Sequence, residues 1–384
     1  MIKPKLCIVV DDSILNHHHG VRRYILSISE CLNDVYEVEF FHWHSSELGK
    51  CVYNKLIFDQ RYAVNNGFNE SVKLDNIDKN SLIDFFTNEI NEKNNNSYFP
   101  FTLLYYGSKL PRTDVCIVGS PWIMYQINEG LNAQKTYCIG YDAIPIMYAM
   151  NTSSDDGLYR FAREHYLGYE RAINEYNGVL AISEASKIQM SYLNLDNDSI
   201  FVVPPFIPYG FNNVENSKRY DNSIILAAPF DERKGFKRIP SLLNKTNVER
   251  VIIFGGVRCR QEDILDFFEQ LECCEVEWWP KVTTEDQIRL YSSSSLLLFP
   301  SYSEGLGLPV IEALACGTNV LVSDIEPLNS LVERSSVLLS KDEEVKAQIN
   351  KQLSSFRCAE NKNFSQAHWG KNEFTNKMLK LFER

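Results

Sequence analysis

Two glutamates on either side of a glycine-rich loop suggest the first chemistry in the chain. Glu304 precedes residues 305–308, and Glu312 lies in what we expect to be the first turn of a helix that begins at Pro309. Glycines let a backbone approach a ligand closely, and N–H groups at a helix N-terminus bind anions. Each dipole interaction contributes only about 0.3–1 kcal/mol, so a diphosphate needs cations as well. Because carboxylates accept hydrogen bonds from sugar hydroxyls, the pattern fits two sugar rings joined by a diphosphate, as in a nucleotide sugar.

Alternating strands and helices must position that loop. Short apolar runs at 5–12, 114–120, 135–142 and 178–183 predict strands, with helices expected at 20–32 and 158–176. The alternation restarts after a polar stretch, which predicts an α/β protein with two Rossmann-like domains facing an interdomain cleft. Ligands should bind there, at the carboxyl ends of the strands. We expect a first domain at 1–210 on the acceptor side, a linker at 211–222, a nucleotide-sugar domain at 223–365, and a helix at 366–384 that crosses back to the first domain.

Composition excludes several classes of protein. A net charge of −11 argues against nucleic-acid binding, and no apolar run approaches the ~20 residues needed to span a bilayer. Ten cysteines are spread along the chain without a C-x-x-C pair, which favours reduced, mostly buried thiols. The first apolar run is short and ends in two aspartates, unlike a signal peptide. We therefore expect a cytoplasmic protein, and peripheral association with the inner face of the cell membrane stays open.

Residues 300–324 resemble the signature of the retaining GT-B glycosyltransferases of family 4, in which seven residues separate two glutamates. This resemblance implies that Glu304 holds hydroxyls of the donor sugar and that Glu312 holds the ribose. It also implies that backbone amides of the loop touch the sugar and the phosphates, at Gly305, Leu306, Gly307 and Leu308. The alternative is an ordinary Gly-Pro turn with acids near a helix N-terminus.

Residues 225–239 are similar to the phosphate-binding turn of that family. Lys234 falls on the family's lysine, which meets the diphosphate as a point charge. Many members also carry an arginine near the positions of Ala228 and Pro229, and this chain has none there. Either Arg233 takes its place, or Lys234 and the amides suffice. A solvated basic loop is the alternative to a binding site.

Residues 17–28 are similar to the first loop and helix of the family. Gly20 should open a helix that faces the cleft, and Arg23 matches the family's arginine. The three histidines at 17–19 look like a metal cluster, but neighbouring side chains diverge on a strand and fan around a helix. We therefore favour a loop that lines the cleft over a metal site.

Residues 141–148 resemble a His-Asp-x-Ile-Pro segment of O-antigen and capsule glycosyltransferases, with Tyr141 in place of the histidine. Asp142 is then expected near the reacting centre or the acceptor, or it caps the next turn. The aromatic stretch 98–107 could contact lipid or a lipid-linked acceptor, although buried packing is the favoured reading. Asp196-Asn197-Asp198 would suit a metal-dependent transferase, but its polar surroundings favour a surface turn.

Taken together, the residues and the resemblance lead us to expect a retaining hexosyltransferase of the GT-B fold. The donor would be a nucleotide diphosphate sugar, with GDP-mannose favoured, and Lys234 and amides would replace a metal at the leaving group. The acceptor would be a bacterial surface polysaccharide, such as the O-antigen of lipopolysaccharide, or a lipid-linked oligosaccharide, and no cofactor is expected. Two alternatives stay open: a non-catalytic partner that binds nucleotide sugar or glycan in a polysaccharide-synthesis complex, and a nucleotide-sugar isomerase or hydrolase on the same fold.

Overall fold

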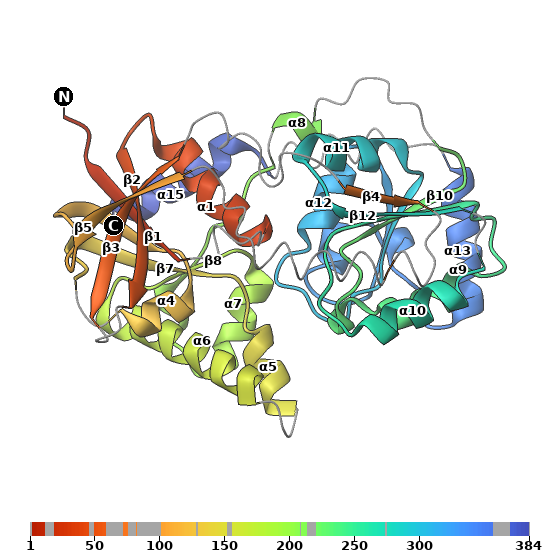
Figure 1. The fold of residues 1–384 in the computed structure, drawn as a ribbon, viewed down its shortest axis with the longest axis horizontal. Helices are drawn as coiled ribbons and strands as arrows, with labels where there is room; N and C mark the ends of the chain where they lie inside the picture. Colours follow the sequence, from red (N-terminus) through yellow and green to blue (C-terminus); the bar gives the residue numbers. More distant parts are fainter. Residues whose placement is uncertain are drawn as a thin grey trace. The chain divides into compact units, whose positions relative to one another are not determined.

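The chain folds into two compact units, shown as ribbons in Figure 1. Unit 1 comprises Met1–Asn66, Tyr98–Phe206 and Trp369–Arg384, and unit 2 comprises Gly67–Ser97 and Ile207–His368. The computed structural model describes residues 2–11, 19–45, 50–58, 72–75, 82, 101–127, 130–151, 156–207, 209–212, 220–272, 275–355 and 369–383.

Unit 1 is built on an eight-stranded sheet. Six neighbouring strands run parallel, in the order β2, β1, β6, β7, β8 and β9. β3 and β5 extend the sheet beyond β2 as antiparallel strands. The order is β5 (Phe101–Gly107), β3 (Cys51–Phe58), β2 (Glu37–Ser45), β1 (Lys5–Val10), β6 (Thr113–Val118), β7 (Ala133–Gly140), β8 (Val179–Ala181) and β9 (Ile200–Val202). Its central strands read as nearly continuous apolar runs because both faces are covered.

Helices cover both faces of this sheet. Tyr137 and Cys138 are neighbours on β7, so their side chains point to opposite faces. Tyr137 packs on Phe382, near the end of α15, whereas Cys138 joins a core cluster that includes Tyr169 of α6. The α-helices described in unit 1 are α1 (His19–Leu32), α4 (Pro121–Gln126), α5 (Ile144–Asn151), α6 (Asp156–Glu175), α7 (Glu184–Ser191) and α15 (Lys371–Glu383).

The last helix returns to unit 1, as expected. Lys371 of α15 forms an ion pair with Glu30 of α1 at 3.1 Å, and the rings of Tyr24 and Phe374 meet edge to face at 5.9 Å. At the other end of α15, the ammonium group of Lys135 donates to the carbonyl of Phe382. A cation at a helix C-terminus complements the helix dipole and satisfies a terminal carbonyl, so the helix is fixed at both ends.

The aromatic stretch at the edge strand β5 is exposed. Tyr105 is 78% exposed, and Leu103, Leu104 and Tyr106 are also exposed. The reading of this stretch as buried packing is therefore wrong for these residues, because β5 occupies the end of the sheet rather than its middle. Residues 98–100 of the stretch lie outside the part that the structure describes.

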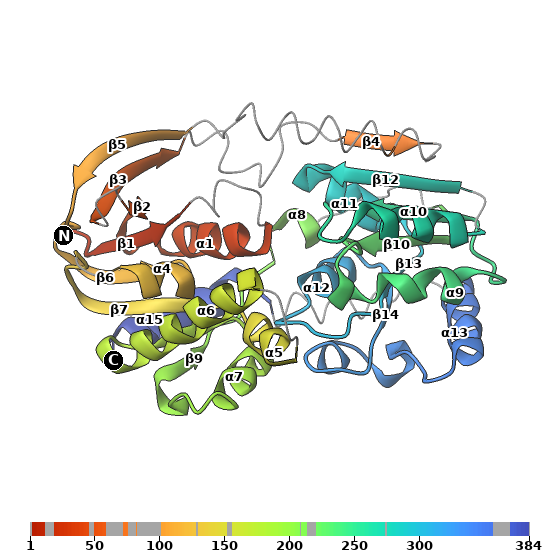
Figure 2. The same cartoon turned by 60° about the horizontal axis from the view of Figure 1, so that its bottom comes forward.

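Unit 2 is built on a six-stranded sheet with one unexpected member. The order is β14 (Asn319–Val322), β13 (Leu296–Phe299), β10 (Ser223–Ala227), β11 (Arg250–Phe254), β12 (Glu275–Lys281) and β4 (Val72–Asp75). All neighbours are parallel except β4, which pairs antiparallel with β12 (Figure 2). Lys73 of β4 also forms an ion pair with Glu277 of β12 at 2.8 Å. Residues 67–97 therefore belong to unit 2, although the sequence placed them in the first domain.

Aromatic side chains form much of the core of unit 2. The ring of Phe230 packs edge to face on Phe267 at 5.3 Å and on Trp278 at 5.2 Å. Among the described residues of this unit, the α-helices are α8 (Tyr209–Asn212), α9 (Ile239–Leu243), α10 (Gln261–Gln270), α11 (Thr284–Ser293), α12 (Leu308–Ala315) and α13 (Asp342–Ser354). In the described part of the chain, no helix combines the length and apolar character needed to cross a membrane.

Candidate active site

The glycine-rich loop joins the end of β13 to the start of α12. Gly307 precedes the helix with a left-handed backbone (φ 86°), and Leu308 is the first helical residue, one position before Pro309. Glu312 is therefore in the second turn of α12, which corrects the expectation that it lies in the first. The reason is that the left-handed glycine, rather than the proline, sets where the helix begins. Glu304 and Glu312 are both buried, as are the intervening Gly305 and Leu306.

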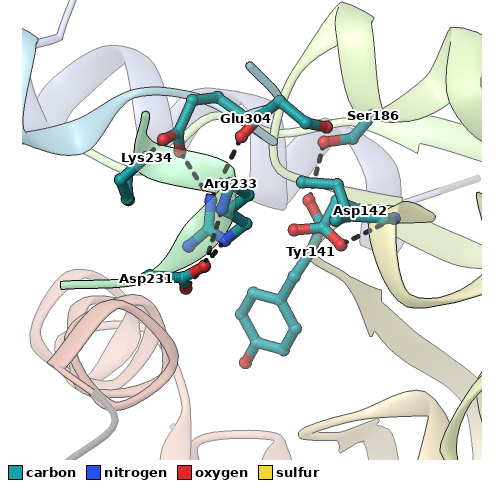
Figure 3. Close-up of polar contacts among 9 residues, drawn as sticks. Tyr141, Asp142, Ser186, Asp231, Arg233, Lys234 and Glu304 are labelled. Atoms are coloured by element: carbon teal, nitrogen blue, oxygen red, sulfur yellow. Dashed lines mark hydrogen bonds and ion pairs between the residues drawn. The ribbon is translucent and has the colours of Figure 1, made fainter. Parts of the chain in front are cut away.

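Two cations meet the carboxylate of Glu304. The Lys234 Nζ donates to Glu304 Oε1 at 2.6 Å, and Arg233 Nη1 lies 3.3 Å from Glu304 Oε2 (Figure 3). Arg233 also pairs through its Nε with Asp231 Oδ2 at 3.1 Å and donates to the Ser303 carbonyl at 3.2 Å. The structure thus brings together three of the residues singled out by the sequence, and Asp231 joins them.

The turn that carries Lys234 packs directly against the loop that carries Glu304. The backbone N–H of Tyr302 donates to the Arg233 carbonyl at 2.7 Å. Gly235 has a left-handed backbone (φ 68°), and a Cβ added there would lie 2.4 Å from the carbonyl oxygen of Pro300. Only glycine allows this approach, so the turn sequence Lys234-Gly235 has a structural reason. The Lys234 ammonium group also lies over the Phe299 ring, 4.3 Å from its centroid.

Burial and charge act in opposite directions on the ion pair. Burial disfavours the ionised form of Glu304, but the nearby Lys234 and Arg233 outweigh it and hold the pKa of Glu304 below its ordinary value. Burial lowers the pKa of the Lys234 ammonium group, and the attraction of Glu304 opposes that effect. Glu304 is therefore an ionised carboxylate at neutral pH, and two cationic side chains of unit 2 surround it.

Glu312 accepts hydrogen bonds from two neutral side chains. Its Oε2 accepts from Gln287 Nε2 at 2.7 Å and from the Tyr291 hydroxyl at 3.3 Å. Both donors come from α11, which begins at a capping box formed by Thr283 and Asp286. The sequence analysis did not single out Gln287 or Tyr291. Their spacing of four residues was the available signal, because it places both side chains on one face of the helix.

The backbone at the end of β10 adopts a conformation that is rare for its residue type. Ala228, near the place where many similar proteins have an arginine, has a left-handed backbone (φ 45°). Its N–H donates to the Phe254 carbonyl at 2.6 Å, and a Cβ added to Gly255 would lie 2.8 Å from the Ala228 Cβ. Strained residues of this kind gather at ligand sites. The position therefore retains a specialised backbone although it lacks the arginine side chain.

Gly20 and Arg23 both lie on α1 of unit 1. Gly20 is the second residue of the helix and is exposed, and Arg23 is buried one turn later. The neighbouring Arg22 is also buried, which lowers its pKa to about 10, and the sequence analysis did not select it. Tyr24 of the same helix meets Tyr141 edge to face at 6.3 Å, so α1 lies beside the segment that carries Asp142. The histidines at 17 and 18 lie outside the described residues.

Asp142 follows β7 and caps α5. Its Oδ1 accepts from the N–H of Ile144 at 3.0 Å, which is the contact expected of the capping alternative. The hydroxyl of Tyr141 donates to the Gly119 carbonyl at 2.9 Å, and burial raises the pKa of Tyr141 well above its ordinary value. Ser186 donates to the Tyr141 carbonyl at 2.6 Å and fixes this backbone (Figure 3). Tyr141 is thus a neutral hydrogen-bond donor at a position where similar segments have a histidine.

A further polar group at the end of β1 was not selected from the sequence. Asp11 Oδ2 accepts from the Trp122 indole N–H at 2.7 Å, and the Trp122 ring packs on His165 at 5.0 Å. Burial lowers the pKa of His165 to about 4, so its ring is neutral at physiological pH. The Asp196 carboxylate accepts from the Asp198 N–H at 3.0 Å, as expected of a surface turn. Within the described residues, no three His, Cys, Asp or Glu side chains form a group that could hold a metal ion.

Comparisons of the sequence with known proteins find similarity to glycosyltransferases. Residues 212–367 match the family model described as "Glycosyl transferases group 1". The serotype-specific mannosyltransferase WbdA of Escherichia coli is 27% identical over 218 residues, which are 52% of this chain and 26% of that protein. The O-antigen chain mannosyltransferase RfbU of Salmonella typhimurium is 24% identical over 249 residues, or 60% of this chain and 67% of the relative. The chain therefore spans only about a quarter of the length of the first of these relatives.

The folds of several solved structures match that of this chain over nearly its whole length. Anabaena Alr3699/HepE, solved with UDP-glucose, superposes with a TM-score of 0.66 at 12% identity and 99% coverage of both chains. WaaG, a glycosyltransferase involved in lipopolysaccharide biosynthesis, gives a TM-score of 0.61 at 14% identity, covering 98% of this chain and 99% of its own. Two α/β units with mainly parallel sheets, matched along their length by such enzymes, identify the fold of this chain as GT-B.

Proposed function

We propose that this chain is a retaining family 4 glycosyltransferase that transfers mannose from GDP-mannose to a growing bacterial surface polysaccharide or a lipid-linked oligosaccharide. The observation that carries the proposal is the buried carboxylate of Glu304 held between Lys234 and Arg233, at 2.6 and 3.3 Å. A carboxylate that binds sugar hydroxyls, placed next to two cations that bind a diphosphate, matches the two halves of a nucleotide sugar.

In this mechanism the residues of unit 2 divide the work. Glu304 holds hydroxyls of the donor sugar, and Lys234 and Arg233 stabilise the negative charge that develops as the diphosphate departs. Amides of residues 305–308 at the start of α12 add further donors, and Glu312 holds the ribose. Preorganised donors aimed at developing charge are the largest catalytic contribution in many enzymes, and this set supplies them without a metal ion.

Unit 1 would serve the acceptor. Asp142, after β7, is the residue we assign to that side. Gly20 and Arg23, on α1, stay candidates for binding the donor, and the ring contact between Tyr24 and Tyr141 links the two segments. The Asp142 carboxylate also caps α5 by accepting from the N–H of Ile144, so any contribution to the acceptor would be made from that anchored position. We assign the reaction to the cytoplasm, at or near the inner face of the membrane.

The relatives support the choice of sugar and of product class. WbdA and RfbU are both described as mannosyltransferases, and RfbU acts on the O-antigen chain. HepE was solved with UDP-glucose, so this fold also accommodates a uridine nucleotide. Mannose is the sugar that the names of the sequence relatives favour, GDP as its carrier is our proposal, and a UDP-linked hexose is the outcome that would redirect it.

Nucleotide binding tests the proposal first. Thermal unfolding is measured with GDP, UDP and dTDP for the wild-type protein and for Glu312→Ala. A ligand present at 100 times its Kd and bound only by the folded state adds about 2.7 kcal/mol to the free energy of unfolding. We expect GDP to raise the Tm of the wild type and to raise that of the variant much less. If none of the three nucleotides raises the Tm at millimolar concentration, the proposal is wrong.

Turnover then separates the alternatives. With GDP-mannose and an oligosaccharide acceptor, product should form in the presence of EDTA, and NMR should show the anomeric configuration of the donor retained. Release of GDP and mannose without acceptor would indicate a hydrolase, and an altered sugar would indicate an isomerase. Nucleotide binding without turnover, together with unchanged cellular polysaccharide after substitution of Glu304, would indicate a non-catalytic binding partner.

A further inference from the structure

Two buried neutral donors from one helix converge on a single oxygen of Glu312. Gln287 Nε2 and the Tyr291 hydroxyl both donate to Glu312 Oε2, at 2.7 and 3.3 Å. All three residues are almost fully buried, with 8%, 0% and 2% of their surfaces exposed. Gln287 and Tyr291 are four residues apart on α11, so they approach the carboxylate from one helix face.

These donors are fixed in place by contacts of their own. The Tyr291 ring packs edge to face on Phe254, at 5.4 Å and 89°, at the end of β11. The Tyr291 backbone carbonyl accepts from the Thr318 hydroxyl at 2.6 Å, which ties α11 to the turn after α12. The N–H of Gln287 donates to the Thr283 carbonyl at 2.9 Å in the first turn of α11. The position of the two donors is therefore set by the fold of unit 2.

The contrast with Glu304 shows what neutral donors accomplish. Glu304 is paired with two cations, which satisfy its charge directly. The donors from α11 carry no charge, so their hydrogen bonds orient the carboxyl group of Glu312 without placing a cation on the oxygen that accepts them. A buried carboxylate without such donors would incur a large desolvation penalty or turn away.

We propose that Gln287 and Tyr291 are positioning residues that aim Glu312 at the ribose diol of the donor nucleotide. They thereby make the chain selective for ribonucleoside diphosphate sugars over deoxyribonucleoside ones. This inference rests on the proposed function, in which Glu312 holds the ribose. It goes further because it names the residues that set the strength of that contact and the class of nucleotide that the contact admits.

A comparison of nucleotides that differ only in the diol tests this directly. Affinities for GDP and 2′,3′-dideoxy-GDP, and for UDP and 2′,3′-dideoxy-UDP, are measured by calorimetry on the full chain. Hydrogen bonds from the two hydroxyls of the diol contribute enough that the wild type should prefer the ribonucleotide by roughly tenfold or more. Glu312→Ala should bring that preference to about one. Gln287→Met and Tyr291→Phe should each reduce it several-fold while their affinity for the dideoxy analogue changes little.

The control is Ser292→Ala, on the same helix. Ser292 is fully buried and its hydroxyl donates to the Ile288 carbonyl, so this variant also loses a buried hydroxyl but not one that meets Glu312. Its preference for the ribonucleotide should equal that of the wild type. Thermal unfolding without nucleotide checks that each variant is folded, and Tyr291→Phe keeps the ring packing if Gln287→Met proves unstable.

The outcomes are distinguishable. If Gln287→Met and Tyr291→Phe weaken both nucleotides of a pair equally, the two residues act only in packing and the inference is wrong, although the proposed function stands. If Glu312→Ala leaves the preference of the wild type unchanged, the assignment of Glu312 to the ribose fails as well. If neither GDP nor UDP binds, the proposed function and the inference fail together.

Discussion

The pair formed by Lys234 and Glu304 gives the sharpest stability prediction. The two side chains are 9% and 8% exposed, and their charged atoms are 2.6 Å apart. Removing one partner of a buried pair leaves an uncompensated charge, which typically costs about 3–5 kcal/mol. Because Arg233 remains 3.3 Å from Glu304, we expect Lys234→Met to fall at the lower end, near ~3 kcal/mol. Glu304→Gln should cost about as much, since it leaves the Lys234 ammonium group facing a neutral amide.

A double-mutant cycle isolates the pair. The combined variant Lys234→Met with Glu304→Gln contains neither charge, so its loss of stability should be well below the sum of the single losses, with a coupling of about 2 kcal/mol or more. Urea unfolding followed by tryptophan fluorescence reports on unit 2 through Trp278, which is buried in its core. The two units need not unfold together, so the transition is fitted separately for each.

The matched control is an exposed pair in the same unit. Arg334 and Asp324 are 2.7 Å apart, close to the separation in the buried pair, but their side chains are 74% and 46% exposed. Solvent screens such pairs, so the cycle of Arg334→Met and Asp324→Asn should show almost no coupling. If the buried pair couples no more strongly than this exposed one, the reasoning from burial is wrong.

Two further predictions concern His165 and Gly307. The pKa of His165 is lowered from 6.5 to about 4. Between these pH values the unfolded chain therefore binds more protons than the folded one. Acidification from pH 7 to 4 should thus remove about 3 kcal/mol of the free energy of unfolding through this residue. His165→Phe should flatten the dependence of the unfolding free energy on pH, and an unchanged profile would contradict the assignment. Gly307→Ala introduces a Cβ at φ 86° and should destabilise by about 1–2 kcal/mol, whereas Gly256→Ala, where an added Cβ meets nothing within 4 Å, should be nearly neutral in the same urea titration.

Most of the central parallel strands of unit 1 could be predicted because each is a short, continuous apolar run. β1, β6, β7 and β8 lie within or overlap the ranges that the sequence indicated, and burial on both faces explains why, whereas the parallel strand β2 was not predicted. The antiparallel strands β3 and β5 were not predicted. β5 lies at the edge of the sheet, and an edge position relaxes the apolar pattern and leaves residues such as Tyr105 exposed. β4 has only four residues, too few to show a period, and its partner strand lies far away in the sequence.

Some residues of the candidate site could be selected from the sequence, and others could not. Glu304, Lys234 and Arg233 could be grouped because glycines and a resemblance marked their loops, and the contacts among them bring those loops together. Asp231 could not be selected, since its role depends on the direction in which the Arg233 side chain turns. The donors to Glu312 come from another helix, and a contact of that kind becomes visible only when the packing of α11 against α12 is known.

The interleaving of the two units sets the order in which the protein can be completed on the ribosome. Strand β4 emerges roughly 200 residues before its partner β12, which at about 5–20 residues per second is a wait of some 10–40 seconds. Unit 1 waits longer still, because α15 packs on α1 and is made only after all of unit 2. Neither unit can therefore complete its folding before the segments that follow it in the sequence have been synthesised. During synthesis, the edge of β4 and the face of α1 remain uncovered, and these are the places where we expect a chaperone to bind the nascent chain.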